Sequence, residues 1–426
     1  MAQQAGTFGY QVATTADGVP LRTKLRRAER LSRLKAYALL LPLFAFIFIT
    51  FFMPILVMMF RSVQNPELAT HFPQTLALLE DWDPAAGEVP PEEVFATLAP
   101  EIAAAYESRA LGRVATRLNY EESGTRSLLT KTGRNVADME APEVEGSWRA
   151  TFLDIDEDWG DVDVWAAIKN YGTPYTLGYY LAALDLHYGQ DGGIVAQPER
   201  YQIYVQVFLR TVWISALVTI LCLVLGYPVA YLLATVPTGT SNLLMILVLL
   251  PFWTSLLVRT TAWVVVLQTE GVLNDLLIFL NVIDDRIQLI FNRFGVIVAM
   301  THILLPFMIL PIFSVMKTIS PSYVRAAQSL GATPFTAFRR VYFPQTVPGI
   351  GAGGILVFIL ALGYYITPAL VGGPTDQMIS YFIADHTNRS LNWGLASAMG
   401  AILLMGVLAM YMLYNRVVGI DNMKLG

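Results

Sequence analysis

Six long apolar segments constrain this chain more than any other feature. Each is long enough to cross a hydrocarbon core of about 30 Å, which takes about 20 apolar residues in a helix. The chain has a mean hydropathy of +0.50 and 14% charged residues, whereas soluble domains carry about 25%. We therefore expect an all-α membrane protein with six transmembrane helices and one soluble part. The predicted spans are Tyr37–Phe60, Val205–Ala234, Leu243–Leu267, Phe294–Met316, Gly349–Val371 and Gly394–Val418.

Basic residues near the ends of these segments indicate how the chain crosses the membrane. Residues 1–36 end in a run of arginine and lysine beside the span at 37–60, and basic flanks prefer the cytoplasm. A signal peptide is the competing interpretation, but no small-x-small cleavage pattern follows the apolar run. We therefore expect cytoplasmic N- and C-termini, with the loops 235–242 and 317–348 on the same side. The basic residues expected inside are Lys317, Arg325, Arg339, Arg340, Arg416 and Lys424, and the aspartates expected outside are Asp275, Asp284, Asp285, Asp376 and Asp385.

Residues 64–200 differ from the rest of the chain because they are acidic and not apolar. They hold 24 acidic and 9 basic residues, although the whole chain has a net charge of only -5. With the N-terminus inside, this insert between the first and second spans faces the periplasm. Its first half, rich in Pro, Ala and Glu, is expected to form loose helices and loops. A surface of this charge attracts cations or repels wrong partners.

Aromatic residues mark the second half of the insert as more ordered. Trp148, Phe152, Trp159 and Trp165 punctuate an acidic stretch. Because large aromatic side chains are mostly buried, we expect them to form a small core of the insert. An aromatic box for a ligand is the alternative.

Few residues in the chain suit catalysis or cofactor binding. Cys222 is the single cysteine and lies in an apolar run, so no disulfide within the chain is possible and a small buried hydrophobe is expected. The sequence has no G-x-x-x-x-G-K-[ST] motif for ATP phosphates. The insert has only His71 and His187, with no H-E-x-x-H or G-x-S-x-G motif, which disfavours a membrane-anchored enzyme. We expect no enzyme activity, metal or cofactor in this chain.

The loop between the fourth and fifth spans carries its own secondary-structure signals. The Ser-Pro pair at 320–321 and the Thr-Pro pair at 333–334 are each typical of a helix start. Gly331 suits a left-handed helix end, so we expect two short helices joined in an L. On these signals alone, an ordinary surface helix-turn-helix is an equal alternative. Two prolines are expected to break the path into the next span: Pro344 and Pro348.

The same loop resembles the EAA loop of ABC-importer permeases. That motif reads Glu-Ala-Ala, then a glycine after three residues and Ile-x-Leu-Pro after nine more. Four positions here are identical, two are similar, and an arginine reverses the charge of the family's glutamate. The corresponding residues are Arg325, Ala326, Ala327, Gly331, Val341, Phe343 and Pro344. The resemblance implies that they couple the permease to an ATPase.

Three further stretches resemble the spermidine/putrescine branch of these permeases. They are LGYPVAYLLA from Leu225, LPFWTSLLVRTTAW from Leu250 and ALGYYITPALVGGP from Ala361. Together with the loop 317–348 they extend over residues 201–426, which implies a five-helix core like that of a type I ABC importer permease. The long insert departs from the compact members of the family.

The resemblance implies a function and a set of partners. The chain would move a small cationic organic solute, such as a polyamine, from periplasm to cytoplasm by alternating access across a bacterial inner membrane. A separate ATP-binding subunit, expected as a homodimer, would bind ATP and Mg²⁺ and act through residues 321–342. A second permease, a periplasmic solute-binding protein and membrane lipid are the other implied partners, and no nucleic acid is. Related importers carry amino acids, opines or other organic solutes, and a secondary transporter is the alternative of a different class.

Polar residues near or inside the spans are the candidates for a solute path, because ionisable groups in a membrane are costly. Aromatic faces suit alkylammonium cations through cation–π attraction. The structural alternatives are snorkelling of the arginine, a satisfied buried histidine, interfacial aromatic belts and solvated loop aspartates. The candidates are Trp253, Thr254, Arg259, His302, Tyr364, Tyr365, Thr367, Asp376 and Asp385.

Overall fold

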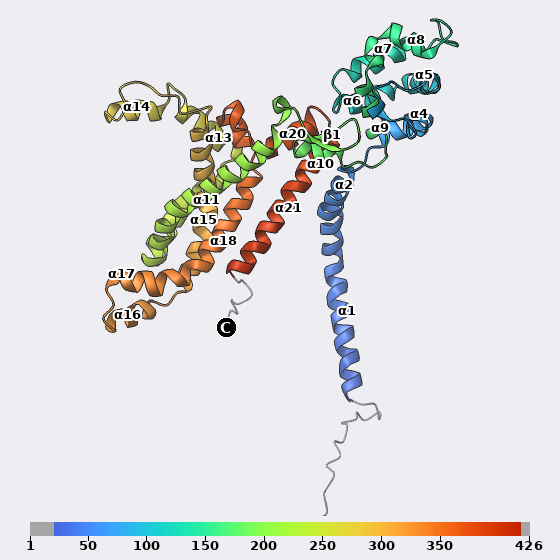
Figure 1. Cartoon of the computed structure of the whole chain (residues 1–426). Helices are drawn as coiled ribbons and strands as arrows, with labels where there is room; N and C mark the ends of the chain where they lie inside the picture. The colour runs from blue at the N-terminus through green and yellow to red at the C-terminus, as the bar shows by residue number, and fades with distance from the viewer. Residues whose placement is uncertain (1–20, 419–426) are drawn as a thin grey trace, which may run out of the picture. The chain divides into compact units, whose positions relative to one another are not determined.

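The computed structural model describes residues 21–418, and this part of the chain is mostly helical (Figure 1). Within it, six helices are long and apolar enough to cross a membrane, which confirms the predicted class and number of spans. Residues 1–20 of the basic N-terminal segment and the C-terminal Lys424 lie outside the described range. The chain divides into two compact units, Met1–Phe60 and Arg61–Gly426. The six helices are Ser32–Arg61, Tyr204–Thr235, Leu256–Phe279, Arg293–Thr318, Pro334–Leu362 and Trp393–Arg416.

The first unit contains a helix that continues through one irregular turn. α1 (Leu21–Ile47) passes through a π-helical turn (Phe48–Phe52) into α2 (Met53–Arg61). The turn lies directly before Pro54, whose ring would clash with the carbonyl group of Thr50 in a regular α-helix, and a wider turn relieves that clash. Most apolar side chains of this helix are exposed, as expected of a helix that faces lipid.

The second unit begins with the insert, which is a bundle of short helices and one small hairpin. Apolar residues at helical spacing give the helices between residues 66 and 170 apolar faces that meet in a common core, whereas the helix at Gly178–Ala183 buries Tyr179 and Ala183 in a separate cluster. The strands β1 (Leu186–Tyr188) and β2 (Ile194–Ala196) pair antiparallel. The helices are α3 (Pro66–His71), α4 (Pro73–Leu79), α5 (Glu92–Glu107), α6 (Leu111–Asn119), α7 (Thr125–Val136), α8 (Trp148–Ile155), α9 (Val162–Asn170) and α10 (Gly178–Ala183).

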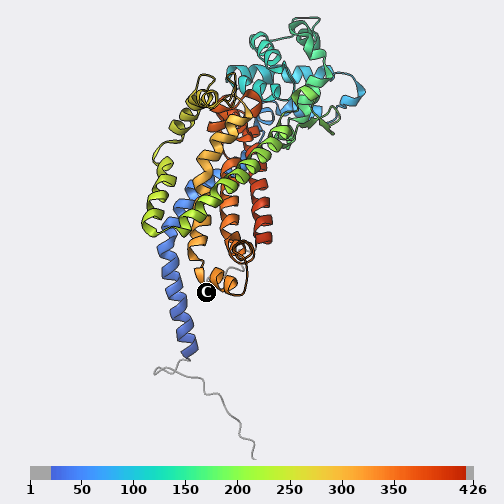
Figure 2. The ribbon, with the colours of Figure 1, turned by 90° about the vertical axis from the view of Figure 1, so that its left-hand side faces the viewer.

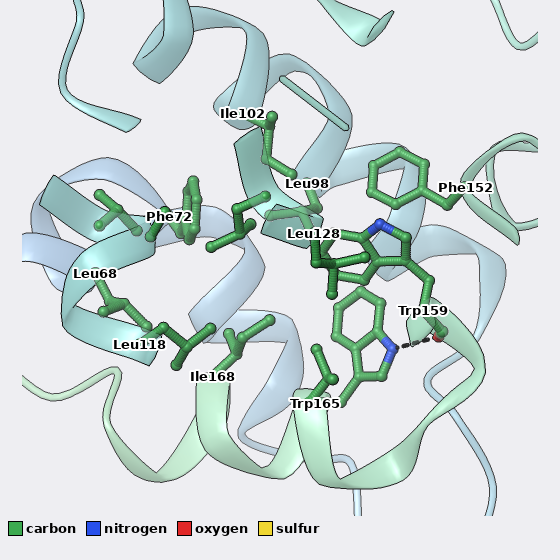
Figure 3. Close-up of a cluster of buried hydrophobic side chains, with 14 of the residues drawn as sticks. Leu68, Phe72, Leu98, Ile102, Leu118, Leu128, Phe152, Trp159, Trp165 and Ile168 are labelled. Atoms are coloured by element: carbon green, nitrogen blue, oxygen red, sulfur yellow. Dashed lines mark hydrogen bonds between the residues drawn. The ribbon is translucent and has the colours of Figure 1, made fainter. Parts of the chain in front are cut away.

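Aromatic residues occupy the core of the insert, as predicted (Figure 3). The ring centroid of Trp159 lies 5.0 Å from that of Phe152 and 5.2 Å from that of Trp165. Both indole N–H groups are satisfied, because Trp159 Nε1 donates to Thr132 Oγ1 at 2.8 Å and Trp165 Nε1 donates to the carbonyl of Trp159 at 3.0 Å. These residues therefore form a packed core and not a box for a ligand.

The first half of the insert is as ordered as the second, so the expectation of loose helices and loops is wrong. α5 and α6 bury Leu98, Ile102 and Leu118 in the same core. Alanine and glutamate favour helices, and the apolar residues recur on one face of each helix. Pro100 is tolerated inside α5.

The remainder of the second unit is the permease core. α11, α15 and α18 pack side by side at its centre (Figure 2), where Cys222 of α11 is buried as predicted. A Cβ at Gly349 would lie 3.0 Å from the backbone of Pro311 and Ile312, so this glycine permits the close approach of α18 to α15. The helices are α11 (Tyr204–Thr235), α12 (Thr238–Leu249), α13 (Leu256–Leu267), α14 (Val272–Phe279), α15 (Arg293–Thr318), α16 (Pro321–Ser329), α17 (Pro334–Ala337), α18 (Phe343–Leu362), α19 (Ile366–Val371), α20 (Ile379–Asn388) and α21 (Trp393–Val418).

The span predicted at Leu243–Leu267 is not continuous. A 3-10 turn at Leu250–Trp253 separates α12 from α13, and the apolar helix long enough to cross a membrane begins only at Leu256. Pro251 lacks an N–H group and cannot continue α12. Ser255 then caps α13, because its side chain accepts a hydrogen bond from the backbone N–H of Val258.

The span predicted at Gly349–Val371 is displaced toward the N-terminus. The helix begins at Pro334, ends at Leu362, and is separated from α19 by an interruption at residues 363–365. The expected break at Pro344 and Pro348 is wrong. Pro344 lies in the first turn of α18, directly after a π-helical turn at 338–342, where a missing N–H group is tolerated.

Candidate functional site

The loop that resembles the EAA motif has the predicted first helix and glycine turn, but its second helix is not short, because α17 continues through the π-helical turn into α18. Ser320 caps α16 by accepting from the backbone N–H of Ser322, and Thr333 caps α17 by accepting from that of Thr336. Between them Gly331 has φ = +89°, which favours glycine. We call residues 320–342 the hairpin.

The turn at Gly331 is a Schellman motif. The N–H of Ala332 donates to the carbonyl of Ala327 at 3.0 Å, and the N–H of Gly331 donates to that of Gln328 at 3.0 Å. These bonds satisfy carbonyl groups that the helix end would leave unpaired. The angle between the two helices is therefore fixed by backbone hydrogen bonds.

Two apolar side chains of the hairpin are unusually exposed. Arg325 and Ala326 are exposed and Ala327 is half-buried. Leu330 is 90% exposed and Phe335 is 70% exposed, although burial of such side chains is favourable. The sequence analysis did not single out Leu330 or Phe335. An apolar residue on each side of the glycine turn, within a polar loop, is the signal that could have found them.

Aromatic contacts hold the base of the hairpin against α11. The ring centroid of Phe338 lies 5.8 Å from that of Tyr231, and the ring centroid of Tyr342 lies 5.5 Å from it. Because residues 338–342 lead directly into α18, the hairpin is joined to two central helices. Val341 is half-buried in this base, whereas Phe343 and Pro344 are exposed.

Several candidate path residues gather where α13, α15 and α19 pack together. Trp263 Nε1 donates to His302 Nδ1 at 3.1 Å, and the hydroxyl groups of Thr260 and Thr367 are hydrogen-bonded at 3.1 Å. Arg259 lies near enough to His302 to act on it electrostatically. Thr260 and Trp263 were not among the predicted candidates. We call these five residues, with Tyr364, the polar patch.

Arg259 provides the positive charge of the polar patch. Its guanidinium carbon lies 5.9 Å from the centroid of the Phe252 ring, and its Nε atom is buried without a hydrogen-bond partner among the described residues. Tyr364 is half-buried and lies within electrostatic reach of it.

The other candidates lie apart from this patch or at its edge. Trp253 is 75% exposed, Thr254 donates to the carbonyl of Pro251 at 2.8 Å, and Tyr365 is exposed in the interruption after α18. Asp376 is buried, and its carboxylate lies 3.1 Å from Arg293 Nε. Asp385, on α20, lies 3.8 Å from Arg389. In the described residues, no cluster of three or more His, Cys, Asp or Glu residues could hold a metal ion.

One carboxylate joins the insert to the first helix of the permease core. Asp185, with φ = +59°, is buried, and its Oδ1 accepts from the N–H groups of Ile203 and Tyr204 at 3.1 and 2.9 Å. Its Oδ2 accepts from the N–H of Val205 at 2.8 Å. Asp185 therefore caps a 32-residue helix from 18 residues upstream, which no local pattern predicts.

Six helices suited to a membrane and a packed three-helix centre are the features of a multi-pass membrane protein. Residues 222–420 match the family model described as "Binding-protein-dependent transport system inner membrane component". The chain belongs to this family, the inner-membrane permeases of ABC importers.

Relatives of known name agree with this assignment. The chain is 35% identical over 224 residues to the spermidine/putrescine transport system permease protein PotB of Salmonella typhimurium. The matched region covers 52% of this chain and 77% of that protein. The chain is 36% identical over 208 residues to PotB of Haemophilus influenzae, covering 48% and 73%. One solved chain of a bacterial alginate ABC transporter, in complex with an alginate-bound periplasmic protein, is 20% identical, with a TM-score of 0.44 over 53% of this chain and 81% of that chain.

Proposed function

We propose that this ABC-importer permease moves a small cationic organic solute, a polyamine such as spermidine or putrescine, from the periplasm to the cytoplasm. The observation that carries the proposal is its similarity to permeases named for spermidine and putrescine over about three quarters of their length. The acidic insert supports it, because 24 acidic residues against 9 basic ones concentrate cations near the protein. The aromatic residues of the polar patch also suit alkylammonium groups.

Coupling to ATP is the second part of the proposal. The hairpin docks onto a separate ATPase subunit, which is a homodimer and binds ATP and Mg²⁺. The exposed Leu330 and Phe335 provide the apolar contact, and Ala326, Ala327 and Gly331 permit a close approach of the backbone. The contacts of Phe338 and Tyr342 with Tyr231 pass a rigid-body movement of the hairpin to α11.

Orientation and partners complete the proposal. The N- and C-termini and the hairpin lie in the cytoplasm and the insert lies in the periplasm, as the basic residues beside the spans suggest. A second permease of the same class and a periplasmic solute-binding protein complete the importer. The remaining coupling positions, Arg325, Val341, Phe343 and Pro344, belong to the same docking region.

A specific observation favours a second class of solute. Arg259 places a positive charge and an unpartnered Nε in the polar patch, and a guanidinium attracts carboxylates and repels cations. An amino acid, an opine or another solute that carries a carboxylate would suit this group better than a polyamine.

The test is substrate-stimulated ATP hydrolysis by the assembled importer in lipid, screened over polyamines, amino acids and opines. We expect stimulation by polyamines, with weaker stimulation at higher salt, because the screening length falls to about 8 Å near physiological ionic strength. Stimulation only by an anionic or zwitterionic solute, without such salt dependence, would contradict the polyamine assignment. Uptake that follows an ion gradient and persists without ATP would instead indicate secondary transport.

A further inference from the structure

A cationic groove lies on the side of the permease core where α11 and α15 begin. Arg210 and Trp213 of α11 and Arg293 of α15 line a cavity of about 610 Å³. Leu209 and Val212 also line it. None of these residues belongs to the polar patch or to the hairpin.

The groove has more positive than negative charge. Arg293 Nε pairs with Asp376 at 3.1 Å, and the side chain of Asp376 is only 7% exposed, so this carboxylate faces inward. Arg210 donates from Nη1 to the carbonyl of Gln377 at 3.2 Å and has no carboxylate within 4 Å among the described residues. Two guanidinium groups with a single carboxylate leave one positive charge and several free N–H donors on the groove wall.

The position of the groove matches a membrane surface. Arg210 is six residues from the start of α11, or about 9 Å along the helix axis. The 32 residues of α11 extend about 48 Å, whereas the hydrocarbon core is about 30 Å thick, so a helix centred in the core extends about 9 Å beyond it at each end, which places Arg210 at the boundary with the headgroups. Tryptophan is enriched at this depth.

An apolar strip continues from the charged end of the groove. Leu209, Val212 and Trp213 stand at helical positions i, i+3 and i+4, and Leu209 is 67% exposed. A ligand that satisfies the whole groove therefore needs an anionic group at one end and a hydrocarbon chain at the other. A phospholipid has both, whereas inorganic phosphate lacks the chain and a polyamine has the wrong charge.

We propose that this groove binds an anionic phospholipid of the inner membrane. The guanidinium groups of Arg210 and Arg293 donate to the phosphate oxygens, and an acyl chain lies along Leu209, Val212 and Trp213. Guanidinium–phosphate pairs are strong because the charged hydrogen bonds can form in parallel. The inference depends on the membrane location of the chain and not on the transported solute.

The test measures phospholipid binding to the purified full chain in detergent, by native mass spectrometry, with phosphatidylglycerol and with phosphatidylcholine. Arg210→Gln leaves the ion pair of Arg293 with Asp376 intact, and we expect it to weaken phosphatidylglycerol binding roughly tenfold. Arg210→Lys, which keeps the charge, should restore most of the affinity. Arg389→Gln, at an exposed arginine outside the spans, is the matched control and should bind like the wild type.

Two outcomes would overturn the proposal. One is equal binding of phosphatidylglycerol by Arg210→Gln and by the wild type, and the other is complete displacement of the lipid by millimolar inorganic phosphate. A second measurement keeps the test decisive if Arg210→Gln is poorly folded. Phosphatidylglycerol with brominated acyl chains should quench more tryptophan fluorescence in the wild type than in Trp213→Phe. An equal loss in both proteins would place the lipid elsewhere.

Discussion

Replacing Gly331 with valine separates the hairpin's role in docking from its role in folding. At φ = +89° a side chain other than glycine costs about 1–3 kcal/mol, and β-branched valine lies at the upper end. No heavy atom lies within 4 Å of a Cβ built at this position, so the strain comes without a clash inside the chain. Such a cost is small beside the total stability of a domain, about 5–15 kcal/mol. We therefore expect Gly331→Val to fold in the membrane.

Docking should be lost even though the protein still folds. Valine would fill the space at the turn and tilt α16 against α17, which displaces Leu330 and Phe335 from their positions on the docking surface. Loss of about 3 kcal/mol of binding free energy would weaken the complex with the ATPase subunit by roughly two orders of magnitude. The assay is co-purification with the ATPase subunit, followed by substrate-stimulated ATP hydrolysis in lipid.

A matched control exists in the insert. Gly124 has φ = +99° and also has no heavy atom within 4 Å of a built Cβ, so Gly124→Val adds similar backbone strain far along the chain from the hairpin. It should lower thermal stability by a similar amount and leave ATPase binding unchanged. Ala327→Asp, which would bury an unpaired charge in the docked complex, should behave like Gly331→Val. Normal assembly and full transport in both hairpin variants would show that the hairpin is only a linker.

Three further predictions address the insert and the topology. Asp185→Ala removes the acceptor of three backbone N–H groups and should destabilise the permease by about 1–3 kcal/mol in thermal unfolding, whereas Asp185→Asn, which tolerates positive φ, should cost less. Burial alone would raise the pKa of Glu92, but hydrogen bonds from Ser147 and two backbone N–H groups lower this pKa in the folded protein. The ionised Glu92 therefore stabilises the fold fully above the ordinary glutamate pKa of about 4.3, and this contribution is lost as pH falls through the lower folded pKa. Glu92→Gln should thus make the stability of the protein depend less on pH in the acid range. Reporter fusions at Ala150 and at Gly331 should report opposite sides of the membrane, and signals from the same side would refute the proposed topology.

The number of spans and the glycine turn of the hairpin follow from local chemistry, so the sequence predicts them, although it misplaces the spans at 243–267 and 349–371. Hydropathy over about 20 residues identifies a membrane helix without knowledge of its neighbours. The caps at Ser320 and Thr333 and the left-handed turn at Gly331 also depend only on adjacent residues. The aromatic core around Trp159 was predictable because large aromatic side chains are rarely left in water.

Features that depend on distant partners could not be predicted in this way. Proline interrupts the helix at Pro251, but the helix continues through Pro344. The two sites differ in the π-helical turn that precedes Pro344. The sequence predicts Asp376 as a loop carboxylate, but in the structure Asp376 is buried and forms an ion pair with Arg293, which is 83 residues away. Asp185 likewise gains its role only when the insert folds back onto the start of α11.

α11 connects the insert to the base of the hairpin. Its first residues are held by Asp185 of the insert, and its last turns are held by Phe338 and Tyr342 through Tyr231. A helix of 32 residues extends about 48 Å and bends little, since each turn is fixed by its own hydrogen bonds. If a movement of the hairpin tilts α11, the N-terminal end of α11 that Asp185 caps must therefore move too, unless the helix bends at Pro228. Pro228 lies between the two contacts, nearer to Tyr231, so most of the helix length remains rigidly attached to the insert.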